Sequence, residues 1–261
     1  MAWLASARSV SRAVNILGST FTHSVGLTMA RRQSDADASD RLTLDWMNRY
    51  GQSCLSICCV ETMRAGPHSQ DGEVYPGQSA DGRGRMFLLN HRSGLDILIT
   101  IATLEARILS RGDLADWPVI GYVARQVGTL FVDRSSKQSG AGALKTIVRA
   151  LKSGHSIALF PEGTAFSGDE IRPLKTGAFK AAQLAQAEIV PIGLAYADPE
   201  AGYGDESFGV HMKRVTGKRR VRVAVEVGEP IMPPHGQDVR ALREQTREQL
   251  QALVNRARAR L

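Results

Sequence analysis

The sequence predicts an α/β fold: a mixed, mostly parallel sheet flanked by helices, preceded by an N-terminal pair of amphipathic helices. Short apolar runs, typical of buried strands, alternate with longer segments of helical periodicity. The 261 residues are 43% hydrophobic and 23% charged, which suffices for the core of one large domain. Polar residues directly follow three of the predicted strands, as they do at the ligand-binding edge of an open α/β sheet.

Residues 1–30 carry an apolar stripe at helical spacing, and Arg8 and Arg12 lie away from it. The stripe consists of Trp3, Val10, Val14, Leu17, Phe21 and Val25. A helix with such a face and a basic start can lie in the interface of a bilayer, pack on the domain or fray as a terminus. The sequence leaves these three interpretations open.

A second helix, a strand and a long loop are expected next. The apolar pattern that starts at Leu42 predicts a helix ending near Gly51, and the apolar residues 54–60 predict a strand. Residues 65–85 are rich in Gly, Ser, Asp and Pro, which is typical of a surface loop.

From residue 86 onward strands and helices alternate, which predicts parallel strands joined by helical connections. The strands are expected at 86–89, 129–132, 156–160, 188–195 and 221–227, and the helices at 96–109, 119–127, 141–151, 176–186 and 237–258. The chain is therefore divided into a helical region expected to associate with a membrane, residues 1–52, and an α/β domain, residues 53–261.

Charge and composition narrow the possible partners. A formal charge of +7 and a pI near 9.6 predict an anionic partner, which is a membrane surface, a phosphorylated substrate or nucleic acid. Aromatic residues make up 6% and are not interleaved with basic ones, which disfavours nucleic acid. No segment has the composition of a transmembrane span or a secretory signal. Cys54, Cys58 and Cys59 lack the spacing of a zinc or disulfide site.

One stretch carries the most specific chemical signal. The strand 86–89 runs into Asn90 and His91, and Asp96 follows five residues after the histidine. In a continuous helix these two side chains would point about 140° apart, so they meet only if His91 lies in a turn before the helix. The carboxylate then fixes the imidazole tautomer and leaves the outer nitrogen free as a base. Taken alone, the pair also fits a helix cap beside a hydrogen-bonded turn residue.

Two further strand ends add polar groups to the same predicted edge. These groups are Asp133 and Arg134 after one strand, Glu162, Gly163 and Thr164 after another, and Lys175 beyond them. The motifs of serine hydrolases, phosphate-loop nucleotide hydrolases, nicotinamide enzymes and zinc proteases are missing from the sequence. A base without a built-in nucleophile predicts direct transfer of a group to an acceptor hydroxyl.

Four ordered blocks resemble the glycerolipid acyltransferase family, which includes the bacterial 1-acylglycerol-3-phosphate acyltransferases. The blocks are Asn90-His91-x4-Asp96, Gly128-Thr129-Leu130-Phe131-Val132-Asp133-Arg134, Phe160-Pro161-Glu162-Gly163-Thr164 and Val190-Pro191-Ile192-Gly193. The resemblance covers about residues 44–230. Each block is weak by itself, and four in order at plausible spacing are specific.

The resemblance implies an O-acyltransferase that moves a fatty acyl group from an acyl thioester to the free hydroxyl of a lysolipid. The reaction it implies most directly converts 1-acyl-sn-glycerol-3-phosphate to phosphatidic acid in phospholipid biosynthesis. By this resemblance His91 is the general base and Asp96 its partner, and Val190 and Pro191 shape a substrate pocket. The residues expected to bind the acceptor are Asn90, Arg134, Glu162, Gly163, Thr164 and Lys175.

The same resemblance implies the partners and the location. The acyl donor is expected to be acyl-CoA or acyl-carrier protein, and no bound cofactor or metal and no nucleic acid is expected. The protein is expected at the cytoplasmic face of the inner (plasma) membrane, as a peripheral or monotopic protein among membrane lipids.

One position departs from the family pattern. Many members continue Glu-Gly-Thr with Arg-Ser, whereas this chain has Ala165 and Phe166. Either Lys175 or Arg172 replaces the missing cation, or the acceptor is not lysophosphatidic acid. A lyso-ornithine lipid is then the alternative acceptor, and a non-catalytic membrane lipid-binding protein is the alternative function.

Overall fold

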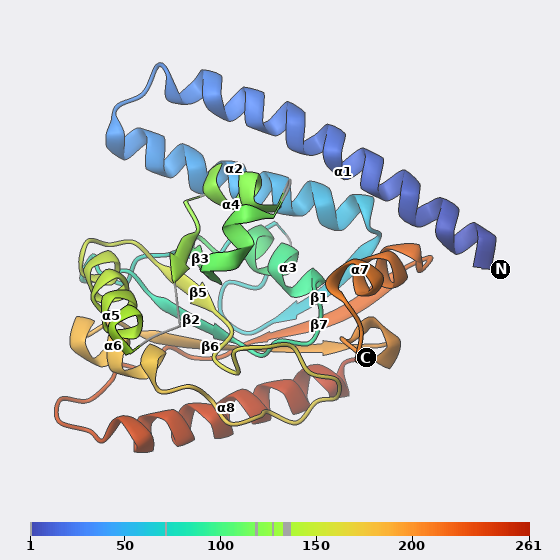
Figure 1. The fold of residues 1–261 in the computed structure, drawn as a ribbon. Coiled ribbons are helices and arrows are strands. Elements are labelled where there is room, and N and C mark those ends of the chain that lie inside the picture. The colour runs from blue at the N-terminus through green and yellow to red at the C-terminus, as the bar shows by residue number, and fades with distance from the viewer. Residues whose placement is uncertain (1, 71, 118–119, 127, 133–136) are drawn as a thin grey trace.

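The computed structural model describes residues 2–70, 72–117, 120–126, 128–132 and 137–261 as a seven-stranded sheet with helices on both faces (Figure 1). The strands are β1 (Val60–Ala65), β2 (Met86–Leu89), β3 (Arg107–Arg111), β4 (Leu130–Val132), β5 (Ile157–Leu159), β6 (Ile189–Tyr196) and β7 (Val221–Val227). The helices are α1 (Ala2–Arg31), α2 (Ala36–Ile57), α3 (Leu95–Thr103), α4 (Ile120–Gln126), α5 (Lys137–Lys152), α6 (Gly177–Ala185), α7 (Phe208–Gly217) and α8 (Val239–Ala259), with the short 3-10 helices η1 (Gly112–Asp116) and η2 (Pro199–Ala201).

Strand β2 lies at the centre of the sheet, whose order is β1-β7-β6-β2-β5-β3-β4. All neighbouring strands pair in parallel except β6 and β7, which are antiparallel. The predicted mixed, mostly parallel sheet is therefore confirmed. Because β2, β5 and β4 run in the same direction, their carboxyl ends lie at one edge.

The alternation of side chains along β2 explains why both faces of the sheet are covered. Phe87 and Leu89 pack into the core cluster that includes residues of α2, α3 and α7. Met86 and Leu88 point the other way, into the cluster formed with α5, α6 and α8. A strand that is apolar at every position is thus buried on both faces, as parallel sheets require.

Three predicted element boundaries are wrong. Helix α2 does not end near Gly51 but runs to Ile57, so the residues from Cys54 onward form a helix before β1. Gly51 allows close packing instead of ending the helix, since a Cβ there would lie 2.7 Å from the backbone nitrogen of Ala102 in α3. Helix α3 ends at Thr103, and part of the segment predicted as its continuation is strand β3.

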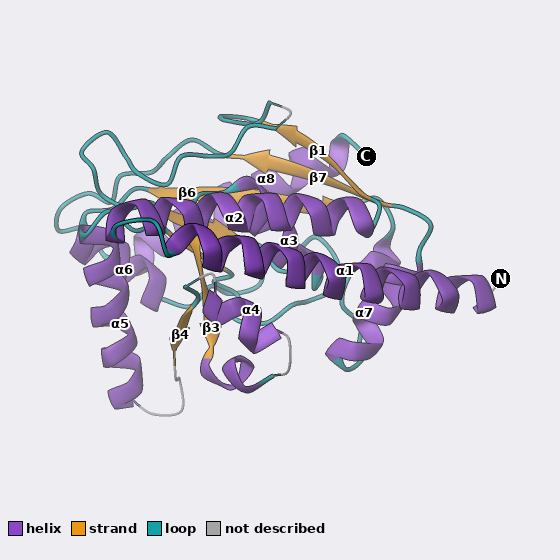
Figure 2. Cartoon of the chain, turned by 90° about the horizontal axis from the view of Figure 1, so that it is seen from above, coloured by secondary structure: helices purple, strands orange, loops and turns teal. Residues whose placement is uncertain are grey.

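The N-terminal pair consists of α1 and α2 packed side by side, with α1 also contacting α7 (Figure 2). The face of α1 turned toward the protein is mostly polar, with Ile16 and Leu27 packed against the core, and the apolar stripe predicted from the sequence is exposed. Trp3 and Phe21, for example, are 78% and 70% exposed. Among the residues that the structure describes, no helix is long and apolar enough to cross a membrane.

Candidate active site

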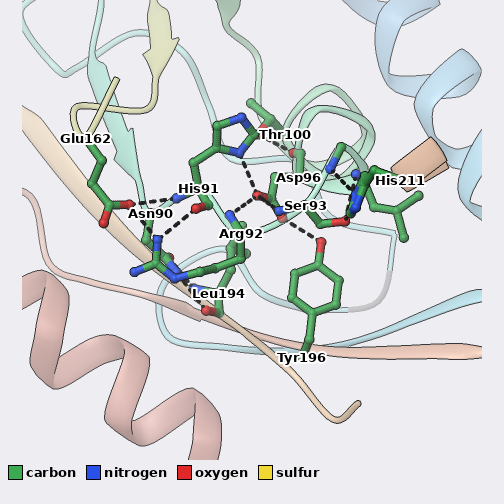
Figure 3. Close-up of polar contacts among 12 residues, drawn as sticks. Asn90, His91, Arg92, Ser93, Asp96, Thr100, Glu162, Leu194, Tyr196 and His211 are labelled. Atoms are coloured by element: carbon green, nitrogen blue, oxygen red, sulfur yellow. Dashed lines mark hydrogen bonds and ion pairs between the residues drawn. The ribbon is translucent and has the colours of Figure 1, made fainter. Parts of the chain in front are cut away.

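His91 and Asp96 meet in the turn between β2 and α3, as the sequence predicts (Figure 3). Strand β2 ends at Leu89, and His91 lies in the turn before the helix. Asp96 occupies the first turn of α3, which points its carboxylate back over the turn. The imidazole Nδ1 of His91 lies 2.8 Å from Oδ2 of Asp96.

The Asp96 carboxylate is fully buried and accepts hydrogen bonds from every side. Its Oδ2 also accepts the backbone N–H groups of Arg92 at 2.6 Å and Ser93 at 2.8 Å. Its Oδ1 accepts the hydroxyl of Tyr196, from the carboxyl end of β6, at 2.5 Å. Burial, and next the nearby Asp96 charge, raise the pKa of Tyr196 well above its usual value, so this hydroxyl stays a donor. These donors stabilise the ionised carboxylate and fix its orientation.

The His91 imidazole is held in place while its outer nitrogen stays open. The ring of Phe160 stacks on it with centroids 4.1 Å apart and an interplanar angle of 16°. Nε2 points away from the buried network (Figure 3), and no described residue hydrogen-bonds to it. His91 lines a small pocket of about 100 Å³ together with Phe160, Leu109 and Gly163. A base with a fixed tautomer, an anion behind it and an open second nitrogen can accept a proton from a bound hydroxyl.

Asn90 is fully buried and bonded to the neighbouring strand. Its side-chain amide donates to the carbonyl oxygen of Leu194 at 2.9 Å, and its Oδ1 accepts the N–H of Leu194 at 2.7 Å. The amide thereby extends the pairing between β2 and β6 beyond the last strand residue. This geometry does not support the expected contact of Asn90 with the acceptor, because both ends of the amide are used within the protein.

Glu162 is likewise buried and committed to the protein. Its Oε2 accepts the backbone N–H of His91 at 3.0 Å and the Arg92 guanidinium at 2.7 Å. Its Oε1 accepts the backbone N–H of Arg172 at 3.0 Å. The Arg92 side chain is 3% exposed, and its Nη2 also donates to the carbonyl oxygen of Glu170 at 2.8 Å. The expected direct contact of Glu162 with the acceptor is therefore not supported, and the carboxylate instead ties the loop after β5 to the His91 turn.

The remaining residues expected to bind the acceptor differ in their solvent exposure. Gly163, Thr164 and Lys175 lie in the segment after β5, where Thr164 and Lys175 are exposed. Gly163 has a φ of +85°, and a Cβ there would lie 2.5 Å from Nζ of Lys175, so the ammonium group packs directly over the glycine. Arg134 lies outside the described residues. Of the two cations expected at the site, Lys175 is the one within the described ranges, and its side chain is exposed beside the pocket of the base.

Comparison with known proteins finds a matching family model. The protein-family model described as Acyltransferase matches residues 73–195, a range that contains His91, Asp96 and the Glu162-Gly163-Thr164 segment. Over this range, just under half of the chain, the protein is similar to the acyltransferase family.

Two similar proteins are named as acyltransferases. This acyltransferase is 26% identical to the lyso-ornithine lipid O-acyltransferase of Brucella abortus over 200 residues, which is 69% of this chain and 75% of that protein. It is 25% identical to the 1-acyl-sn-glycerol-3-phosphate acyltransferase of Neisseria gonorrhoeae over 178 residues, 66% of this chain and 69% of the relative.

A solved structure shares the fold over the whole length. The crystal structure of the 1-acyl-sn-glycerophosphate acyltransferase of Thermotoga maritima superposes with a TM-score of 0.72 at 16% identity, covering 97% of this chain and 99% of that one. At this identity the likeness shows the fold alone, and it extends to the N-terminal helices as well as the sheet.

Sequence reasoning missed three residues around the site of this acyltransferase. Arg92 immediately follows the histidine, but nothing in the sequence shows that its guanidinium is buried against Glu162. Tyr196 ends β6, so the strand-end rule that found His91 would also have found it. His211 lies on α7, a helix the sequence did not predict. Val190 and Pro191, expected to shape a pocket, are instead buried within β6, where both pair with β2.

Proposed function

We propose that this acyltransferase transfers a fatty acyl group from an acyl thioester to the free hydroxyl of a lysolipid, and that 1-acyl-sn-glycerol-3-phosphate is its acceptor. The observation that carries the proposal is the His91–Asp96 pair, whose free Nε2 opens to a pocket while its anion is buried and fully hydrogen-bonded.

The proposed reaction is a direct displacement. Nε2 of His91 removes the proton of the acceptor hydroxyl as the oxygen attacks the thioester carbonyl, and a tetrahedral oxyanion forms. The buried Asp96 stabilises the imidazolium through Nδ1. When the intermediate collapses, the carbon–sulfur bond breaks and His91 returns the proton to the departing thiolate. The products are the new ester and the free thiol.

The acceptor phosphate is proposed to bind at the segment after β5. Lys175 supplies an exposed ammonium group beside Gly163, and Thr164 supplies an exposed hydroxyl in the same turn. Arg172 is also exposed, and its guanidinium stacks on Phe166 at 5.2 Å from the ring centroid. Lys175 packs over Gly163, which lines the pocket at His91, and this cation favours a phosphorylated acceptor over a neutral one.

Lyso-ornithine lipid is the alternative acceptor. Ala165 and Phe166 stand where many family members have Arg-Ser, and the Brucella abortus relative is named for lyso-ornithine lipid acylation. The ornithine headgroup combines a cationic amino group with a carboxylate and has no net charge, so an exposed lysine beside the base favours the anionic phosphate of lysophosphatidic acid over it. The charge at this turn therefore separates the two acceptors.

An apolar cavity next to the base is proposed to hold the acyl chain. It has a volume of about 250 Å³ and lies between α5 and α6, lined by apolar side chains such as Leu144, Ile147 and Leu159. Leu109 and Phe160 line both this cavity and the smaller pocket at His91, so the two adjoin. An apolar chain can thus extend from the base into the core of the domain.

The donor is proposed to approach the outer surface of α5 and α6, where an open groove carries only basic charges. The groove contains Lys145, Arg149, Lys152 and Lys180. In the described part of the chain no carboxylate pairs with any of the four, and α5 and α6 contain no acidic residue. Both candidate donors are anionic: coenzyme A carries phosphates, and an acyl-carrier protein is acidic.

The charge of this groove can be tested by reversal. Arg149→Glu should raise KM for the donor severalfold, whereas Arg240→Glu, an exposed arginine on α8, should leave it unchanged. Measuring both variants with acyl-CoA and with acyl-carrier protein distinguishes the two donors. An equal KM in both variants with either donor would contradict this docking site.

We further propose that the protein lies on a membrane through α1. Its apolar stripe faces outward over the length of the helix, which is unusual for a surface that remains in water. Arg8 and Arg12 do not contribute to membrane binding as the basic start of the helix suggested, because both donate hydrogen bonds to carbonyl oxygens at the end of α7. The cytoplasmic face of the inner (plasma) membrane is the proposed location, where acyl thioesters are available.

Thioester consumption by the purified protein tests the proposed function. Palmitoyl-CoA and palmitoyl-carrier protein are each offered with lysophosphatidic acid and with lyso-ornithine lipid. We expect turnover with lysophosphatidic acid and loss of turnover in a folded His91→Ala variant. A variant that keeps a tenth of the rate would contradict the role of His91.

Turnover only with lyso-ornithine lipid would overturn the proposed acceptor. A protein that floats with liposomes but turns over neither acceptor would support a lipid-binding protein instead.

A further inference from the structure

A second histidine lies behind the catalytic turn, on the side away from the substrate pocket. His211, on α7, is fully buried, and its Nε2 lies 3.0 Å from the backbone nitrogen of Gly94 and 3.0 Å from Oγ of Ser93 (Figure 3). The ring of Tyr203 stacks on the imidazole with centroids 4.2 Å apart. None of the features that define the His91–Asp96 pair requires a histidine at this place.

The hydrogen bonds determine which nitrogen of His211 carries the proton. A backbone N–H can only donate, so the bond from Gly94 requires an unprotonated Nε2. The proton of the neutral ring then lies on Nδ1, which faces Oε1 of Glu206 at 3.2 Å. Burial lowers the pKa of His211, which favours the neutral ring. Glu206 is in turn held by the Arg214 guanidinium.

The bonds of His211 fall on residues that hold the catalytic carboxylate. Ser93 donates its backbone N–H to Oδ2 of Asp96 at 2.8 Å, the same oxygen that binds His91. Gly94 precedes the first residue of α3, the helix that carries Asp96. Fixing the hydroxyl of Ser93 and the N–H of Gly94 therefore fixes the peptide groups on which the His91–Asp96 geometry depends.

The contact between α7 and this turn is close and is supported from behind. A Cβ at Gly94 would lie 2.5 Å from Sδ of Met212, so a larger residue at this position would force the Met212 side chain to shift. At the other end of α7, Arg12 donates to the carbonyl oxygens of Thr216 and Lys218, and Arg8 donates to that of Gly217. Helix α7 is thus bonded at its carboxyl end to α1, while His211 near its middle supports the active-site turn.

We propose that His211 is a positioning residue for acyl transfer: its Nε2 acts as the acceptor that orients the Ser93–Gly94 backbone and, through it, the His91–Asp96 pair. The inference rests on the proposed role of His91 as the general base. It predicts that the acceptor atom, not the bulk of the ring, is what catalysis requires.

Two substitutions separate the acceptor from the ring. His211→Phe keeps a planar ring but leaves the Gly94 N–H and the Ser93 hydroxyl without their acceptor. His211→Gln removes the ring but can place an amide oxygen near the position of Nε2. We expect His211→Phe to lower kcat by about 10- to 100-fold with KM for donor and acceptor changed by less than about threefold. We expect His211→Gln to restore kcat to within about threefold of wild type.

A pH profile tests the proposal without the phenylalanine variant. The charged and titratable groups that face His211 or bond to the ends of α7 are Asp96, Tyr203, Glu206, Arg214, Asp198, Glu200, Lys218, Arg8 and Arg12. Burial holds the pKa of His211 below its usual value, so this ring gains its proton toward the acid end of the profile. Protonation of Nε2 removes the acceptor of the Gly94 N–H, so wild type should show an ionisation in the acid limb of kcat that His211→Gln lacks, and the limb should be less steep in that variant.

The outcomes divide clearly. A folded His211→Phe enzyme within twofold of wild-type kcat, or a His211→Gln enzyme as impaired as His211→Phe, would overturn the proposal. If His211→Phe does not fold, identical acid limbs in wild type and His211→Gln would overturn it, and a loss of steepness would support it. His155→Gln, a histidine substitution distant from the turn, is the matched control and should keep wild-type kcat. A wild-type protein without turnover would instead refute the proposed function itself.

Discussion

The two segments that meet at the candidate active site are built in opposite ways. In the turn after β2, the carboxylate of Asp96 is fully buried, and the polar groups around it are bonded to one another. In the segment after β5, Glu162 is buried in the same manner, but Thr164 and Lys175 beyond it are exposed. Lys175 makes no ion pair with any carboxylate within the described ranges.

This difference separates two tasks of a transferase. A general base must be oriented to within a fraction of an ångström, so its turn is fixed by bonds that do not involve the substrate. A headgroup site must admit and release a substrate, so its cation remains in solvent until the acceptor arrives. Substitutions in the buried turn should therefore lower kcat, and substitutions in the open segment should raise KM.

Asp96→Asn should give the largest effect. The amide keeps the size of the side chain but removes the anion that stabilises the imidazolium, so we expect kcat to fall by about 10³-fold or more. KM should change little, because Asp96 is buried and does not contact the substrate. Steady-state kinetics with both substrates varied measures this. A variant that keeps more than a tenth of kcat would contradict the assignment of the pair, provided that circular dichroism shows the native fold.

Glu162→Gln should lower both stability and activity. The substitution leaves the Arg92 guanidinium, 3% exposed, without its counter-charge, which costs about 3 kcal/mol of unfolding free energy. We expect kcat to fall by about 10- to 100-fold, because Glu162 also accepts the backbone N–H of His91. Urea denaturation and steady-state kinetics measure the two effects.

Glu170→Gln is the control for this pair. Glu170 binds Arg92 through its backbone carbonyl while the residue itself is exposed, so its carboxylate should contribute less than about 0.5 kcal/mol. Equal stability of the two variants would show that the buried ion pair does not hold the turn.

Tyr196→Phe should have a smaller effect on the same carboxylate. It removes one of the donors to Asp96 and no charge, so we expect kcat to fall by about tenfold, equivalent to about 1.4 kcal/mol. Tyr50→Phe is the matched control, because that hydroxyl bonds to Thr20 between α1 and α2, away from the site. If both variants keep wild-type kcat, the Tyr196 bond is not needed to orient Asp96.

The fold was predictable where the hydrophobic periodicity agrees with the residues that begin and end each element. The strand 86–89 and the helix near 237–258 were predicted nearly to the residue, since β2 is apolar throughout and α8 has a regular stripe. The ends of α2 and α3 were not, because tertiary packing decided them. Gly51 in α2 allows α3 to pack closely against α2. Sequence alone cannot distinguish such a glycine from one that ends a helix.

The site was predictable to the extent that its residues are neighbours in sequence. His91 and Asp96 are five residues apart, and local geometry already limits how they meet. Tyr196 and His211 reach the same turn from 100 and more residues away, so only the packing of β6 and α7 brings them there. The roles of Asn90 and Glu162 also depended on burial, because an exposed amide or carboxylate binds a ligand whereas a buried one binds the protein.

Lys175→Ala should have the smallest effect on kcat and the effect most specific to the acceptor. The ammonium group is exposed beside Gly163, so its loss removes one charge-assisted bond to a phosphate without disturbing the core. We expect KM for lysophosphatidic acid to rise by about tenfold at low salt, with kcat nearly unchanged. The difference from wild type should shrink as ionic strength increases. Lys213→Ala, an exposed lysine on α7, should change neither constant. A fall in kcat at unchanged KM would instead place Lys175 with the buried turn, and the division between a rigid base and an open headgroup site would no longer hold.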